Sequence, residues 1–195
     1  MNPHPRFFAW SIFRNVRAFL VASLITVAIP AVLFAQATKV TSTTGHYSAI
    51  FPAPAEQNVE PPKTENGLTY SIETYRATLD DQMFVTVSTS YTGATVNTQK
   101  ELQANVDNFV NGIKAKLTSN KPTTYSTPWS SIAGLEFSAE TDALTFQGRF
   151  FVQGNDVWGI LYGARKEAVS EAMKDQFFRS LEINAARPKG EHGPE

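Results

Sequence analysis

The chain has 195 residues, enough for one domain with accessory segments, and it contains no cysteine. The lack of cysteine excludes disulfide bonds, thiolate nucleophiles and thiolate metal ligands. Its 17 basic and 18 acidic side chains nearly balance and form no long run of one sign, so the charge gives no reason to expect nucleic acid as a partner.

The first 37 residues have the pattern of an export signal. An uncharged, largely apolar stretch over residues 18–37 ends in Ala-Gln-Ala, the small-x-small pattern that a signal peptidase cleaves. The segment contains three arginines and no acidic residue, which leaves 14 basic against 18 acidic side chains, a net charge of −4, for the rest of the chain. The three arginines precede the apolar stretch: Arg6, Arg14 and Arg17.

An uncleaved membrane anchor is the alternative for this segment. The apolar run over residues 18–35 reaches the lower length limit for a membrane-spanning helix, although Pro30 interrupts it. In both cases the arginines hold the N-terminus in the cytoplasm. We therefore predict an extracytoplasmic domain, periplasmic or secreted, or anchored in the inner membrane. The domain touches the membrane only through this segment, if it is uncleaved.

Polar and proline-rich stretches follow the export segment. Residues 38–46 are small and polar, and we predict a spacer there. Residues 47–51 form a short predicted strand. Residues 52–67 contain four prolines and an Asn-Gly step, so we predict a long loop.

Two strands and a helix are expected next. Residues 68–77 alternate between apolar and polar side chains, and residues 83–91 form a β-branched strand after a turn at Asp80 and Asp81. A capping box beginning at Thr98 then starts a helix, which Pro122 ends. Its apolar residues fall on one stripe: Leu102, Val106, Phe109, Val110, Ile113 and Leu117.

The second half of the chain predicts four strands and a second helix. A hairpin turn at Gly154-Asn155-Asp156 joins the last two strands. The helix spans residues 167–180, and residues 184–195 form a disordered polar tail. The four strands cover residues 125–129, 135–139, 144–152 and 157–163.

The element order predicts the α+β class. Strands joined by short turns make an antiparallel sheet of about six to seven strands, and the two main helices pack on its faces. A signal or anchor helix precedes this single domain, which covers residues 47–183.

The sequence contains few candidates for catalytic residues. The three histidines lie in the export segment, the spacer and the tail, so neither a Ser-His-Asp arrangement nor a histidine zinc site is predicted. Glu136, Glu140 and Asp142 cluster and suit an acid/base pair or Ca²⁺. The alternative is a solvated strand face, because Glu136 and Glu140 point outward together. We predict no catalytic residue, no metal and no cofactor.

One group of side chains is a candidate binding surface. Arg149 and Phe151 share a strand face, and Arg165 follows the next strand. An arginine beside an aromatic ring suits contact with a protein or an anionic ligand. The alternative is that Phe151 packs beneath a helix while Arg149 pairs with a carboxylate such as Glu136.

Several local sequences carry a family resemblance. Residues 47–52 (YSAIFP), 134–137 (GLEF), 148–151 (GRFF) and 177–183 (FFRSLEI) resemble small exported bacterial domains. Those domains have the fold of PsbP, the extrinsic subunit of photosystem II, which a Ran-binding nuclear import factor shares. The resemblance covers residues 47–183 and implies the fold and an accessory or binding role without catalysis. It carries no site residues across.

Two functional hypotheses follow from the sequence. The first is a non-enzymatic envelope protein that binds another protein or a small ligand through a sheet face or the proline-rich loop. The second is a carboxylate-based hydrolase acting on an envelope substrate.

Overall fold

A computed structural model describes residues 37–44, 46–65, 67–93 and 95–184. Its strands and helices, in chain order, are β1 (Thr38–Thr41), β2 (Tyr47–Phe51), β3 (Glu56–Glu65), β4 (Leu68–Leu79), β5 (Gln82–Thr92), α3 (Thr98–Ile113), β6 (Lys116–Ser126), β7 (Ser131–Glu140), β8 (Leu144–Gln153), β9 (Asp156–Arg165), the 3₁₀ helix η1 (Lys166–Ala168), α4 (Glu171–Arg179) and β10 (Glu182–Ile183).

Two predicted segments lie outside these residues. The export segment, apart from Ala37, and the polar tail, apart from Asn184, are not among the described residues. Within the part of the chain that is described, no helix is long and apolar enough to cross a membrane.

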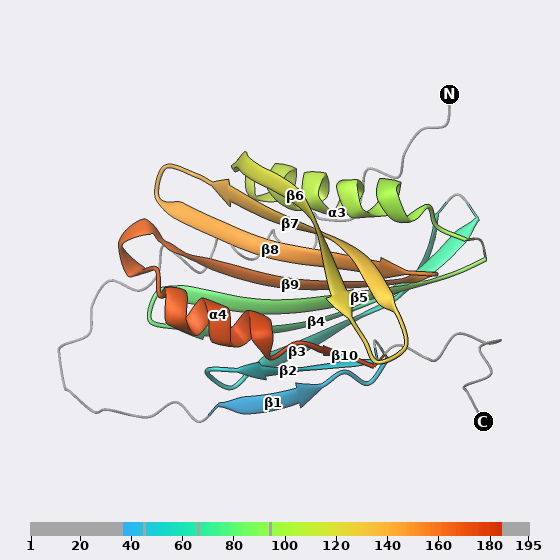
Figure 1. The fold of residues 1–195 in the computed structure, drawn as a ribbon, viewed down its shortest axis with the longest axis horizontal. Helices are drawn as coiled ribbons and strands as arrows, with labels where there is room; N and C mark the ends of the chain where they lie inside the picture. The colour runs from blue at the N-terminus through green and yellow to red at the C-terminus, as the bar shows by residue number, and fades with distance from the viewer. Residues whose placement is uncertain (1–36, 45, 66, 94, 185–195) are drawn as a thin grey trace.

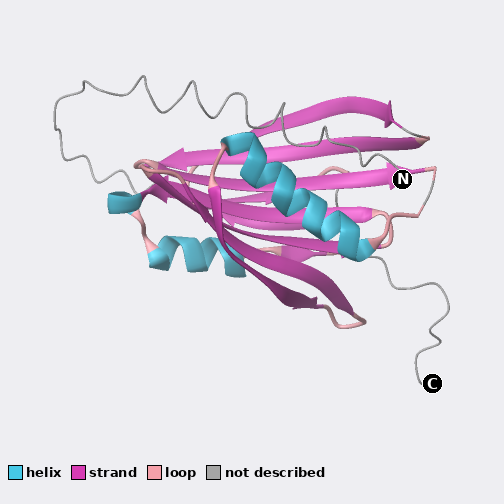
Figure 2. Ribbon diagram, turned by 90° about the horizontal axis from the view of Figure 1, so that it is seen from above, coloured by secondary structure: helices cyan, strands magenta, loops and turns pink. Residues whose placement is uncertain are grey.

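Seven strands form one antiparallel sheet in the order β3-β4-β5-β9-β8-β7-β6. Helix α3 covers one face of this sheet, and α4 lies on the other (Figure 1, Figure 2). A second sheet, with the order β1-β2-β10, lies on the same side as α4 (Figure 1). The predicted α+β class and antiparallel sheet are confirmed, whereas the three-stranded sheet was not predicted.

Both faces of the large sheet are buried, so the core has two parts. Strand β9 lies in the middle of the sheet and is buried at every position except its two ends. Between the sheet and α3 the core contains Leu102, Val106, Phe109, Phe137, Phe146, Phe150 and Leu161. On the opposite face, between the large sheet and the layer formed by α4 and the small sheet, the core contains Tyr47, Phe51, Phe84, Trp158, Ile160, Tyr162 and Phe177.

The two predicted hairpin turns are confirmed. Asp80 and Asp81 have φ values of 46° and 58°, and two successive positive values are what a two-residue turn between antiparallel strands requires. Gly154, with a φ of 60°, begins the turn between β8 and β9.

The predicted loop over residues 52–67 is wrong, because most of it is strand β3. This strand lies at the edge of the large sheet. A proline there lacks a backbone N–H, but no neighbouring strand on the outer side needs that donor. Its pairing with β4 shifts between Glu60 and Lys63, where Pro61 and Pro62 stand. The prolines are therefore accommodated at a bulge on a strand edge.

The predicted spacer over residues 38–46 is also wrong. Residues Thr38–Thr41 form β1 and pair with β2, so the folded domain begins before residue 47. The stretch after β1 binds a buried carboxylate, described below, and this contact has no local signal in the sequence.

The ends of the first helix differ from the prediction. The N-cap is Asn97, whose side chain accepts from the backbone of Lys100, and not Thr98. The helix ends at Ile113 because Lys114 adopts the left-handed conformation. Pro122 lies within the edge strand β6 and does not end the helix.

The last elements also have different bounds. Of the strand predicted at residues 125–129, only residues 125 and 126 are in a strand, as the end of β6, which starts at Lys116. The second helix begins at Glu171 with Ser170 as its N-cap, because η1 occupies the preceding residues.

A buried carboxylate fastens the N-terminal part of the domain to the large sheet. Glu73, on β4, is only 1% exposed and faces the side that carries α4. The loop after β1 supplies five hydrogen bonds, from Ser42 Oγ and from the backbone and hydroxyl groups of Thr43 and Thr44, at 2.5–3.2 Å. Gln57 and Tyr75 each add one at 2.8 Å.

This network keeps Glu73 ionised. Burial disfavours its charge, but the hydrogen bonds from residues 42–44 and from Tyr75 outweigh that cost and hold the pKa of Glu73 well below its ordinary value. For Tyr75, burial and the adjacent Glu73 raise the pKa to about 12, so its hydroxyl remains a donor. One acceptor thus satisfies donors from three separate segments.

Acid should weaken the fold through this residue. In the unfolded chain Glu73 titrates near its ordinary pKa of 4.5, whereas in the folded protein it titrates well below it. The folded state therefore binds fewer protons, so the stabilisation from Glu73 is complete above about pH 4.5 and is lost as the pH falls below that value. Urea unfolding midpoints should decline below about pH 4.5 more steeply for the wild type than for Glu73→Gln. Equal slopes would contradict this assignment.

Candidate functional site

The structure does not bring the three predicted binding residues together. Phe151 lies in the core on the α4 side, 3% exposed, with its ring 5.6 Å from that of Tyr125. A partner therefore has no access to it in this conformation.

Arg149 lies on the same face as Phe151, as expected, and has structural partners. Its Nε donates to Glu136 at 2.7 Å, and its guanidinium lies 5.1 Å from the centre of the Phe178 ring. This is the packing alternative that the sequence offered for both residues. Glu136 also pairs with Lys121 at 2.9 Å.

Arg165 belongs to the opposite face and lines a cavity. Along β9 it alternates with Ala164, which lies in the core on the α4 side, so its side chain points toward the α3 side. Its Nε lies 3.7 Å from Asp81 Oδ1. A binding role for Arg165 stays a prediction, and its surroundings define the candidate site.

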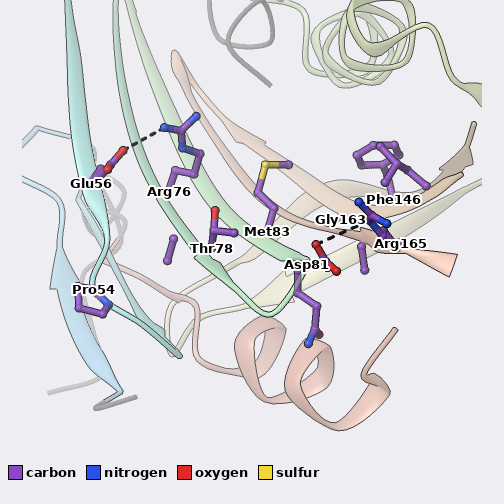
Figure 3. A pocket seen from close by; sticks show the side chains of 13 residues that line it. Pro54, Glu56, Arg76, Thr78, Asp81, Met83, Phe146, Gly163 and Arg165 are labelled. Carbon is purple, nitrogen blue, oxygen red and sulfur yellow. Dashed lines mark hydrogen bonds and ion pairs between the residues drawn. The ribbon is translucent and has the colours of Figure 1, made fainter. Parts of the chain in front are cut away.

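The cavity has a volume of about 470 Å³ and lies beside the hairpin between β4 and β5 (Figure 3). Its floor is a row of four residues in register across four strands. Thr78 faces Met83, Met83 faces Gly163, and Gly163 faces Phe146. Helix α3 packs over β7 and β8, and its Phe109 ring lies 5.8 Å from the Phe146 ring at one side of the cavity floor.

Gly163 shapes the floor. A Cβ atom on this residue would lie 2.9 Å from two carbons of the Phe146 ring, closer than ordinary contact. The absence of a side chain therefore lets the ring lie against β9 and adds no bulk to the cavity. A glycine inside a strand is a sequence signal of such close approach.

Charged side chains border the apolar floor on two sides. Arg76 pairs with Glu56 at 3.0 Å, and Arg165 pairs with Asp81 (Figure 3). In both pairs the carboxylate is more than half exposed. An exposed pair contributes only about 0–1 kcal/mol, so Arg165, whose side chain is 38% exposed, can exchange its partner at little cost.

The carboxylate cluster is divided between a strand and a turn, because Glu136 and Glu140 belong to β7 whereas Asp142 is exposed in the turn before β8. Glu136 and Glu140 share a strand face, as predicted, and Glu140 pairs with Lys166 at 3.2 Å. Burial disfavours the charge of Glu136, but its hydrogen bonds to Lys121 and Arg149 outweigh this and lower its pKa. Among the described residues, no three His, Cys, Asp or Glu side chains converge as metal ligands would.

Sequence reasoning missed most of the cavity. Arg76, Met83 and Phe146 come from three strands, and only the register between those strands brings them together. It also missed Glu73, although this residue shares a strand face with Tyr75 and Ala77, both buried. A glutamate among apolar residues on one face was the available signal.

The architecture defines a class of protein: an α+β domain whose antiparallel sheet has a helix on each face and a cavity beside one hairpin. Within that class, the fold is PsbP-like. The solution structure of cyanobacterial PsbP (CyanoP) from Synechocystis sp. PCC 6803 is similar, with a TM-score of 0.51, 10% sequence identity, and coverage of 80% of this chain and 98% of that one. The predicted resemblance of fold is confirmed.

A second solved structure is less similar to this chain. A crystal structure of a protein from Bacteroides thetaiotaomicron VPI-5482 matches with a TM-score of 0.33 and 15% identity, covering 82% of this chain and 52% of that one. No protein-family model matches the chain, and none of the curated proteins does.

Proposed function

We propose that this chain is a non-enzymatic binding domain that works outside the cytoplasm and holds a small ligand in the cavity beside the β4–β5 hairpin. The observation that supports this most is the apolar floor bordered by two ion pairs, of which the pair of Arg165 with Asp81 is exposed and easily exchanged. Ligand sites in proteins are typically concave, largely apolar and equipped with a few polar groups, and their volumes run from about 300 to 1,000 Å³.

The fold and the N-terminal segment support the rest of the proposal. A PsbP-like fold agrees with the accessory or binding role that the sequence resemblance implies, although fold by itself does not fix function. The location outside the cytoplasm rests on the arginines and the apolar stretch of residues 1–37.

A carboxylate-based hydrolase is less well supported. A general acid needs a carboxyl group with a raised pKa, whereas the pKa of Glu136 is lowered and both of its oxygens form ion pairs. Glu140 is paired with Lys166 on the same face. These contacts suit a solvated, charge-balanced strand face.

Filling the cavity should abolish ligand binding. Thr78 is exposed and lines the cavity, so Thr78→Trp places an indole over the floor without disturbing the core. The neutral fluorescent dye N-phenyl-1-naphthylamine should bind the wild type saturably, and the substitution should weaken binding about tenfold or more. The measurement is a fluorescence titration of the full chain.

A matched control separates the cavity from other dye sites. Thr124, on β6, is also an exposed strand threonine but does not line the cavity, so Thr124→Trp should leave the affinity unchanged. All three proteins carry residues 1–37, so dye bound there contributes equally. If Thr78→Trp bound the dye as tightly as the wild type, the cavity would not be the site.

A further inference from the structure

The cavity offers a fixed apolar surface beside an exchangeable cation. We infer that its ligand is an amphiphile with one carboxylate, which binds Arg165 while its apolar part lies over the partly exposed Leu144 and Met83. This inference rests on the proposed function and adds the chemical class of the ligand.

The strand register places the arginine at the edge of the apolar floor. Arg165 is opposite Leu144 in the pairing of β8 with β9, and Gly163, two residues earlier, is opposite Phe146. Residues two apart on a strand point to the same side. A ligand carboxylate at Arg165 therefore has its apolar part directed along the row that contains Phe146, Gly163 and Met83 (Figure 3).

The present partner of Arg165 is easily replaced. Arg165 Nε lies 3.7 Å from Asp81 Oδ1, and the two side chains are 38% and 54% exposed. The backbone N–H of Arg165 also donates to the Asp81 carbonyl at 3.4 Å, a contact that an exchange of side-chain partners leaves in place. A ligand carboxylate can form two parallel hydrogen bonds to a guanidinium, which is stronger than one long contact. The exchange leaves Asp81 in water, where a free carboxylate is well solvated.

Comparison with Arg149 shows why Arg165 is the arginine to test. Arg149 is held at 2.7 Å by Glu136, which is only 24% exposed, and its guanidinium lies over the Phe178 ring. If Arg149 bound a ligand instead, it would lose its contacts with Glu136 and Phe178, and the partly buried Glu136 carboxylate would lose one of its two cationic partners. Arg149→Gln is consequently a matched control, since it removes an arginine outside the cavity lining.

Displacement of the neutral dye by amphiphiles with the same chain tests the charge of the head group. Dodecanoate should displace it from the wild type at a concentration about tenfold below that of dodecanol or dodecyltrimethylammonium. Arg165→Gln should remove this preference and leave the displacement by dodecanol unchanged. Arg149→Gln should behave as the wild type.

A second variant tests the exchange itself. Asp81 has a positive φ, which asparagine tolerates, so Asp81→Asn removes the competing charge and preserves the turn. It should tighten the binding of dodecanoate. A carboxylate preference that survived Arg165→Gln, or equal displacement by dodecanoate and dodecanol, would overturn the inference and leave the cavity proposal standing. Loss of the Thr78→Trp effect would instead overturn the cavity proposal.

Discussion

Replacing Glu73 by glutamine should lower the free energy of unfolding by about 3 kcal/mol. The carboxylate accepts seven hydrogen bonds in a site that is 1% exposed. An amide loses the charge and turns two N–H donors toward a ring of donors, which leaves buried groups without acceptors. Chemical denaturation at neutral pH, followed by far-ultraviolet circular dichroism, measures the change.

Glu136→Gln is the matched control for this prediction. Glu136 also lies on the α4 side of the large sheet, but the side chains of its partners Lys121 and Arg149 are 64% and 35% exposed. Its loss should cost about 1 kcal/mol or less. If the two substitutions destabilised the protein equally, Glu73 would have no special role in fastening residues 42–44 to the sheet.

Truncating Phe177 to alanine should cost about 4 kcal/mol, the largest effect expected of any single substitution considered. Phe177 is 1% exposed and, together with Phe178, packs α4 into the core. Its ring lies 5.0 Å from that of Phe51 and 5.3 Å from that of Phe84, so it joins the small sheet to the large one. Removing the ring leaves a cavity between two layers that cannot close around it.

The neighbouring Gln176 supplies the control for Phe177→Ala. Gln176 is exposed on the same helix, so Gln176→Ala should change the stability by no more than about 0.5 kcal/mol. Because the floor of the proposed cavity lies on the α3 side of the sheet, the dye affinity of folded Phe177→Ala should equal that of the wild type. A small loss of stability, or a loss of dye binding in the folded protein, would show that the two faces are not separated as described.

The separation of the two faces explains why the predicted binding group of Arg149, Phe151 and Arg165 is split between them. Period-two alternation within a strand correctly placed Arg149 and Phe151 on one side of β8. It did not relate that side to Arg165 on the neighbouring strand, because the relation depends on the pairing register. Arg165 therefore shares a cavity with Arg76 and Met83, far from the other two residues in its group.

Elements that depend on local chemistry could be predicted from the order of the residues. The alternation along β4 and β5 and the turn at Asp80 and Asp81 follow from side-chain spacing and backbone preference, and each is present. The apolar stripe of α3 is present up to Ile113, whereas Leu117, which was predicted to extend it, lies on β6. Together they were sufficient for the α+β class and the antiparallel sheet.

Features that depend on pairing between distant segments could not be predicted in this way. Strand β3 tolerates its prolines because it is an edge strand, and β1 exists because β2 offers it a partner. Glu73 is buried as a charged hydrogen-bond acceptor because residues 42–44 fold over it and donate to its carboxylate. The cavity exists because a glycine on β9 meets Phe146 and Met83 across strands that are distant in sequence. Local spacing fixes which side of its strand a residue faces, whereas the assembled sheet fixes what covers that side.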